Sequence, residues 1–178
     1  MDDRTAVALF DDFVHYSNDR GLPIEGVAIG DESHIIAEHH FLSDRARSIY
    51  SHTKSYVSTA IGIAIGDGLL TLDDTLDDVV DGDLPEDADP RIAQITLRDL
   101  LTMSSGFGDG FLMIPGRRAG EGCPDYLSYM LHKPVAVTPG KDFCYSSADT
   151  YLAGRMLEHV TGMRLGEYLW RRIFEPLG

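Results

Sequence analysis

A helix with almost no charge is the feature that most restricts the fold of this chain. Helical spacing is predicted from Ser51 to Ile65, where Lys54 is the one charged side chain. Gly66 and Gly68 end the pattern. Apolar residues recur along this stretch and leave no broad polar face: Val57, Ala60, Ile61, Ala64 and Ile65. We therefore expect this helix to be buried, with other elements packed around it.

The other segments predict an α+β protein in which helices predominate. Apolar residues at helical spacing run from Asp3 to Asn18, and two short apolar runs, GVAIG and HIIAEHHFL, have the pattern of a β-hairpin. The glycine-rich segment FGDGFLMIPGRRAGEG predicts a loop long enough to shape one wall of a pocket. Further helices are expected over residues 96–105, 124–131, 147–161 and 165–173. The chain has neither internal repeats nor a dividing linker, so residues 1–178 are expected to belong to a single domain.

The charge of the chain argues against two classes of partner. The formal net charge is -14, so nucleic acids and anionic membrane surfaces would repel the protein. Much of this charge lies between Asp73 and Pro90, a block without Lys or Arg. The block lacks the ligand spacing of a calcium loop, which favours a solvated loop. An acidic interaction module, with or without calcium dependence, is the alternative.

Several features predict a cytoplasmic protein without a metal or cofactor. No segment approaches the roughly 18 apolar residues of a membrane span. The first residues, MDDRTAVALF, are acidic where a secretory signal is basic. In the cytoplasm Cys123 and Cys144 are expected to be reduced thiols, and their neighbours provide too few ligands for a metal site.

The segment Ser51-His52-Thr53-Lys54 is an S-x-x-K arrangement that can carry nucleophilic chemistry. Residues three apart on a helix share a face. A serine hydroxyl becomes a good nucleophile when a neighbouring base takes its proton, and a lysine in a dry setting can be that base. The N-terminus of the helix can also stabilise developing negative charge. The ordinary alternative is that Ser51 caps the helix and Lys54 extends along the surface.

Three segments together resemble the β-lactamase-related serine hydrolases, the family of class C β-lactamases, penicillin-binding proteins and related esterases. IYSHTKSYVSTAIGIAIGDGLLTLDDTL resembles the nucleophile helix with its following loop. ITLRDLLTMSSGF resembles the short helix that ends in a serine-glycine turn, and PGKDFCYSSADTYLAGRMLEHVTG resembles the segment with the second catalytic motif. The segments follow one another in the family's order and approximate spacing across nearly the whole chain.

This resemblance implies a site and a fold. Tyr145 corresponds to the tyrosine of the family's Y-x-N motif and would move a proton between Ser51 and the leaving group. Ser147 stands where the family has asparagine, so its shorter side chain would bind a substrate carbonyl or Lys54 less firmly, which favours esters over β-lactams and peptides. The implied fold is β-lactamase/transpeptidase-like, a helical cluster packed on an antiparallel sheet. The family's third motif, a K-T-G or H-x-G strand, is not in the sequence, so residues 1–178 are expected to be the N-terminal portion of such a domain, with an incomplete sheet.

The function implied is that of a serine-dependent acyl hydrolase that acts on a small ester or amide through an acyl-enzyme on Ser51. Self-association, or completion by a C-terminal segment, is expected of the incomplete sheet. Two alternatives stay open at this stage. One is a ligand-binding or penicillin-binding protein that does not turn over, and the other is the acidic interaction module.

Overall fold

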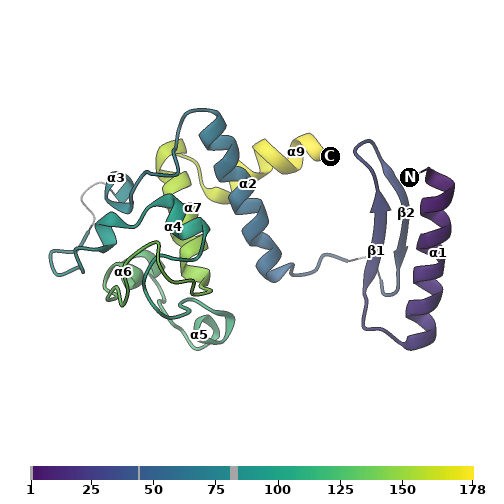
Figure 1. Cartoon of the computed structure of the whole chain (residues 1–178), viewed down its shortest axis with the longest axis horizontal. Coiled ribbons are helices and arrows are strands. Elements are labelled where there is room, and N and C mark those ends of the chain that lie inside the picture. Colours follow the sequence, from purple (N-terminus) through teal and green to yellow (C-terminus); the bar gives the residue numbers. More distant parts are fainter. Residues whose placement is uncertain (1, 44, 81–83) are drawn as a thin grey trace. The chain divides into compact units, whose positions relative to one another are not determined.

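The computed structural model describes residues 2–43, 45–80 and 84–178. The chain divides into two compact units, Met1–Ser48 and Ile49–Gly178, and each is described by itself (Figure 1). Within the described residues no helix is long and apolar enough to cross a membrane.

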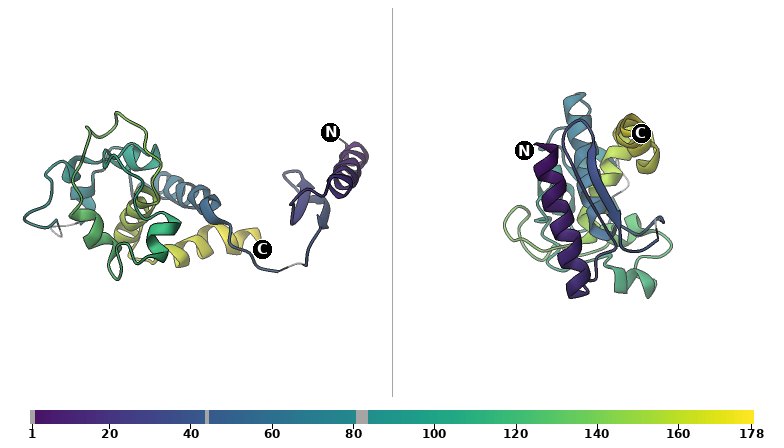
Figure 2. Two further views of the ribbon diagram at one scale, coloured as in Figure 1. Left: turned by 90° about the horizontal axis from the view of Figure 1, so that it is seen from below. Right: turned by 90° about the vertical axis from the view of Figure 1, so that its right-hand side faces the viewer.

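The N-terminal unit consists of one helix and a two-stranded antiparallel sheet. Helix α1 (Asp3–Arg20) begins after Asp2, whose carboxylate accepts a hydrogen bond from the Thr5 amide. Strands β1 (Gly26–Gly30) and β2 (Ile35–His40) pair in the predicted hairpin, with an irregularity between Ile29 and Gly30. Figure 2 shows α1 lying along this hairpin, and it packs against β2.

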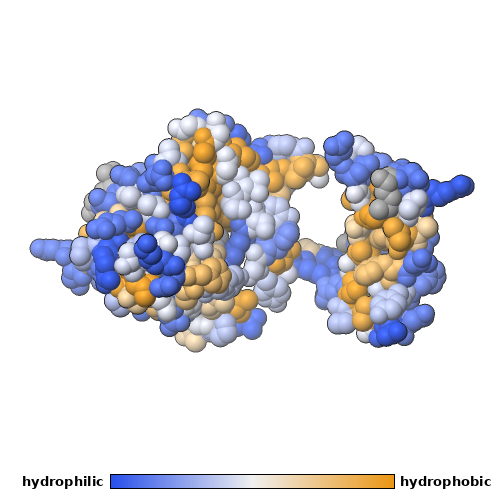
Figure 3. Space-filling model, viewed as in Figure 1, coloured by the Kyte–Doolittle hydropathy of each residue, from blue (hydrophilic) through white to orange (hydrophobic). Residues whose placement is uncertain are grey.

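Few side chains of the N-terminal unit are buried. The buried residues described there, Ala6, Phe10 and Ser17, all belong to α1. Large apolar side chains remain exposed on both elements, among them Phe13 on α1 and Ile35 at the start of β2, which is 63% exposed. Figure 3 shows apolar residues at the surface of this unit. A helix and two strands alone bury little apolar area, so this unit has a small core.

The C-terminal unit is helical, and its core lies between three helices. The side chains of α2, α4 and α7 meet there, with Ile61, Leu100 and Leu152 fully buried. The helical segments are, in chain order, η1 (Tyr50–His52), α2 (Thr53–Gly66), α3 (Leu76–Val80), η2 (Ile92–Gln94), α4 (Leu97–Leu101), α5 (Ile114–Arg118), α6 (Tyr126–Leu131), α7 (Ser147–Thr161), α8 (Leu165–Leu169), η3 (Trp170–Phe174) and α9 (Glu175–Leu177).

Helix α2 is buried on one face only. Val57, Ala60, Ile61 and Ala64 are buried as predicted, whereas Ser55, Ser58, Thr59 and Gly62 are exposed. Ile65, also expected in the core, is half-buried. The expectation of a buried helix was therefore wrong for the exposed face. Small residues occupy the exposed side, and such residues produce neither a polar nor an apolar signal in the hydrophobic pattern.

Several segments differ from their predicted form, and α4 ends at Leu101 instead of near Gly106. The expected acidic loop contains α3, because Leu76 is buried as an anchor and acidic residues favour a helix N-terminus. The expected glycine-rich loop contains α5, which has a proline in its first turn, where the fixed φ of proline suits a helix. The helix expected over 165–173 continues from α8 into a π-helical stretch, η3. Residues 81–83 of the acidic block lie outside the described residues.

Candidate active site

Ser51 lies in the 3₁₀ turn η1, immediately before helix α2. The residue before it, Tyr50, has a left-handed backbone with φ 47°. A residue with a side chain rarely adopts this conformation, and such strain is concentrated at functional sites. The turn presents Ser51 at the surface, where its side chain is exposed. A substrate can therefore reach the Ser51 hydroxyl.

Lys54 follows one turn later, near the start of α2. Its Nζ lies 4.9 Å from the centroid of the Tyr145 ring. Lys54 is half-buried, so the dry environment expected for it is only partly present. An ammonium at this distance from an aromatic ring is attracted to its face, which holds the two side chains together.

Tyr145 reaches this site from the loop before helix α7. Its hydroxyl donates a hydrogen bond of 2.6 Å to Oγ of Ser51. The hydrogen bond with Ser51 lowers the pKa of Tyr145 below that of a free phenol, burial acts in the opposite direction, and Lys54 lowers it further. Ser51, Lys54 and Tyr145 thus form one cluster in which a proton can pass between hydroxyl oxygens.

Two loops hold the segment that carries Tyr145. The amide of Cys144 donates to the Met103 carbonyl at 2.8 Å, and the amides of Ser147 and Ala148 both donate to the Phe111 carbonyl at 3.2 Å. Gly110 lies against the same segment, since a Cβ there would be 2.9 Å from the carbonyl oxygen of Tyr145. The glycine-rich composition after residue 106 predicted a pocket wall, but spacing alone did not indicate that this loop supports Tyr145.

Ser147, the remaining predicted site residue, is the first residue of α7. Its hydroxyl donates to Sδ of Met113 at 3.5 Å. Ser147 is half-buried, and its hydrogen bond to Met113 directs its hydroxyl at the loop before α5. The structure therefore brings three of the four predicted residues together and engages Ser147 with a different partner.

A pocket of about 200 Å³ opens beside Lys54. Its walls come from α2, from the end of α4 with the following turn, and from α7. Apolar and hydroxyl side chains line it, among them Ser58, Leu101, Met103 and Thr150. A pocket with this lining can accept a small apolar group that carries one or two hydrogen-bonding atoms.

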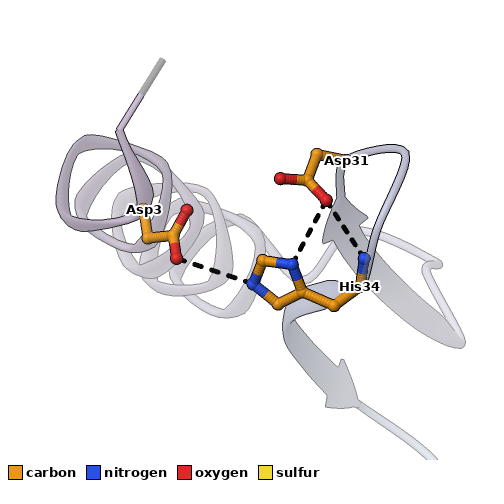
Figure 4. A group of neighbouring side chains, drawn as sticks. All are labelled: Asp3, Asp31 and His34. Carbon is orange, nitrogen blue, oxygen red and sulfur yellow. Dashed lines mark hydrogen bonds and ion pairs between the residues drawn. The ribbon is translucent and has the colours of Figure 1, made fainter.

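The N-terminal unit contains a separate group of side chains with metal-ligand chemistry (Figure 4). Nε2 of His34 lies 3.5 Å from a carboxylate oxygen of Asp3, and its Nδ1 lies 3.2 Å from Asp31. Asp31 accepts hydrogen bonds from the Ser33 hydroxyl and from the backbone amides of Ser33 and His34, and these bonds lower its pKa to about 2. All three members of the group are exposed. Each ring nitrogen of His34 already faces a carboxylate, so the group joins α1 to the hairpin as a polar network.

The helical cluster, and a serine that is hydrogen-bonded to a tyrosine beside a lysine, agree with the family resemblance seen in the sequence. A family model described as Beta-lactamase matches residues 44–178. The chain belongs to this family, and its α+β, β-lactamase/transpeptidase-like fold is the predicted one.

Relatives with known names agree with this assignment. Lovastatin esterase of Penicillium rubens is 34% identical over 148 residues, which cover 72% of this chain and 37% of the esterase. The structure of a D-stereospecific amidohydrolase from Streptomyces has 28% identity and a TM-score of 0.59, covering 74% of this chain and 42% of that one. The structure of the octameric penicillin-binding protein homologue from Pyrococcus abyssi has 25% identity and a TM-score of 0.68, covering 100% of this chain and 43% of that one. The chain thus spans less than half the length of each of these relatives.

Proposed function

We propose that this chain provides the acylation machinery of a serine-dependent acyl hydrolase, with Ser51 as the nucleophile. The observation that carries the proposal is the 2.6 Å hydrogen bond between the Tyr145 hydroxyl and Ser51 Oγ, next to Lys54. The family membership of residues 44–178 supports the same class of reaction.

The cluster can acylate Ser51 in two successive steps, an addition to the substrate carbonyl and the departure of the leaving group. When Tyr145 is ionised, its oxygen accepts the Ser51 proton as Oγ forms a bond to the substrate carbonyl carbon. The Tyr145 hydroxyl then donates that proton to the leaving alcohol or amine as its bond to the carbonyl carbon breaks. Water hydrolyses the Ser51 ester by the reverse sequence, which releases the acid and restores the hydroxyl. Lys54 stabilises the anionic form of Tyr145 throughout.

A small ester is the substrate class that the residues favour. Ser147 replaces an asparagine amide with a shorter side chain, and its hydroxyl is directed at Met113, so a peptide or β-lactam carbonyl would be held weakly. The relative named lovastatin esterase supports the same class. A small amide is the second candidate substrate class, and the amidohydrolase relative supports it.

Labelling with a fluorophosphonate probe tests the nucleophile. We expect a single adduct on intact protein, mapped to Ser51 and absent from Ser51→Ala. The matched control is Ser128→Ala, which removes an exposed serine on α6 that does not line the pocket and should leave labelling unchanged. An adduct that persists in Ser51→Ala would contradict the proposal.

A p-nitrophenyl ester then separates a hydrolase from a binding protein that is acylated without turnover. Steady release of p-nitrophenol beyond one equivalent supports the hydrolase. A burst of one equivalent with no further release supports the binding protein.

A further inference from the structure

Asp149 is a fully buried carboxylate that the proposed chemistry does not use. It lies in the first turn of α7 and is 0% exposed. Its Oδ1 accepts a 2.9 Å hydrogen bond from the Ser105 hydroxyl, while its Oδ2 is buried without a hydrogen-bond partner. Burial raises the pKa of Asp149 to about 6, and the charge of Asp99 acts in the same direction. A buried carboxylate is costly, so its position calls for a physical reason.

Asp149 belongs to a polar cluster that joins two separate segments. Among the residues that the structure describes, five polar or charged residues are buried, and four lie at this junction: Ser104, Ser105, Ser146 and Asp149. Ser104 and Ser105 come from the turn after α4, and Ser146 and Asp149 from the start of α7. The hydrogen bond between Ser105 and Asp149 is the link between the two sides that uses both side chains.

The turn that Asp149 contacts has an unfavourable backbone. Met103 has φ 57° and Gly106 has φ 90°. A Cβ at Gly106 would lie 2.5 Å from the Val137 carbonyl oxygen, so this turn passes closer to its neighbour than a side chain permits. A strained turn persists only when surrounding contacts hold it.

The same turn is hydrogen-bonded to the segment that carries Tyr145 and shares a pocket with Lys54. The Met103 carbonyl accepts the hydrogen bond of Cys144, the residue before Tyr145. The Met103 side chain lines the pocket beside Lys54. The Ser104 carbonyl accepts a 2.8 Å hydrogen bond from Gly140, at the start of the loop that carries Tyr145. These two hydrogen bonds connect the turn to the segment that carries Tyr145.

We propose that Asp149 is a positioning residue: by holding Ser105, it fixes the turn over residues 103–106 against α7 and thereby keeps the Tyr145 phenol on Ser51. The inference rests on the proposed function, because it concerns the placement of the proposed proton carrier. The competing account is that Asp149 and Ser105 only stabilise the fold.

The ionisation of Tyr145 distinguishes these accounts and requires no catalysis. Tyrosinate absorbance is titrated in the 178-residue chain, and the same titration in a Tyr145→Phe partner of each variant is subtracted. Ser105→Ala removes the hydrogen bond and leaves the Asp149 charge in place. We expect the Tyr145 titration to move upward, toward a free phenol, as the phenol leaves Ser51 and Lys54. Acylation by the fluorophosphonate should slow on the order of 10- to 100-fold, the effect of a small misplacement.

Two further variants make the result specific. Ser104→Ala is the matched control, because the Ser104 hydroxyl bonds within its own turn, to Thr102 and Asp99. It should leave the Tyr145 titration unchanged. Asp149→Asn keeps an oxygen that can accept from Ser105 but removes the charge. It should keep Tyr145 in place and leave its titration as in the parent.

Three outcomes would overturn the inference. The first is a folded Ser105→Ala protein, judged by its near-ultraviolet circular dichroism, in which Tyr145 titrates as in the parent. The second is an equal upward shift in Ser104→Ala. The third is an upward shift in Asp149→Asn as large as that in Ser105→Ala. The proposed function fails on a different observation, a lack of labelling at Ser51, so the two failures can be told apart.

Discussion

The Tyr145 hydroxyl lies 2.6 Å from Ser51 Oγ although the two residues are 94 positions apart in the chain. The contact joins the turn before α2 to the loop before α7. Helices α2 and α7 pack against each other in the core, so the same packing that stabilises the helical unit brings their N-terminal ends, and these two side chains, together.

Lys54→Ala and Tyr145→Phe should each slow acylation of Ser51 by about 10²–10⁴, the usual effect of losing a positioned acid–base group. The double variant should lose much less than the product, because the ammonium acts through the phenol. Single-turnover kinetics with a p-nitrophenyl ester measures all three rates. Tyr50→Phe, which removes an exposed hydroxyl beside Ser51, is the control and should keep the parent rate. Multiplicative losses would show that the two side chains act independently.

The pH dependence of acylation should follow Tyr145. Because the hydrogen bond with Ser51 and the charge of Lys54 lower the pKa of this phenol, the base form is populated below the pH at which a free tyrosine ionises. The acylation rate should rise with pH through that shifted value and level off above it. Lys54→Ala should move the midpoint upward, and Tyr145→Phe should abolish the rise. A midpoint that stays fixed when Lys54 is removed would contradict the assigned roles.

Asp149 should make the protein less stable as the pH rises from about 4 to about 6. Its pKa is raised from 3.8 to about 6 in the folded state, so between these values the native protein holds a proton that the unfolded chain has lost. The stabilisation is fully present below pH 4 and is lost as the pH rises through 6. A shift of this size corresponds to about 3 kcal/mol.

Urea denaturation of the parent and of Asp149→Asn at several pH values measures this effect. The free energy of unfolding of the variant, relative to the parent, should increase by about 3 kcal/mol between pH 4 and pH 7. Asp31, whose pKa is lowered to about 2, changes stability below pH 4 in both proteins and cancels in the difference. A difference that is flat across this range would show that the Asp149 carboxylate titrates as an exposed one.

We also predict that the 178-residue chain self-associates and has little ester turnover. The hairpin has two strands, and apolar side chains such as Ile35 and Phe13 are exposed beside it, so other strands or copies can pair with it. Ile35→Lys should reduce the sedimentation coefficient, whereas Leu177→Lys, at an apolar site that is also exposed, should not.

A C-terminal segment from the family with the K-T-G or H-x-G strand, added as a second polypeptide, should restore a monodisperse protein. It should also raise turnover by about 10²–10³ by supplying an oxyanion-hole donor. Ordinary turnover by a monomeric 178-residue chain would contradict this prediction.

The sequence predicted the elements whose pattern is periodic. The hairpin, helix α1 and helix α7 follow from apolar spacing and capping residues, and α2 follows for its buried face. The short helices α3 and α5 were missed because one turn is too short to show a period, so a buried anchor or a proline decides its conformation.

The site was predicted unevenly for a related reason. The proximity of Ser51 and Lys54 follows from helical spacing, whereas that of Tyr145 was implied by the family resemblance and by no local rule. Two further pairings, of Asp149 with Ser105 and of His34 with Asp3, could not be predicted. The residue types show that each side chain can bind a polar partner, but they do not identify which residue it binds. Such contacts depend on tertiary packing, which a single sequence does not display.

Gly110 shows how a residue that has no side chain can limit the evolution of a site. Its missing side chain allows the loop to lie against the Tyr145 carbonyl, so any larger residue must displace the backbone of the proposed proton carrier. Loop residues that face a substrate can vary and alter specificity, but this position cannot drift with them. Laboratory evolution for new substrates should therefore accumulate changes on either side of Gly110 and leave it intact.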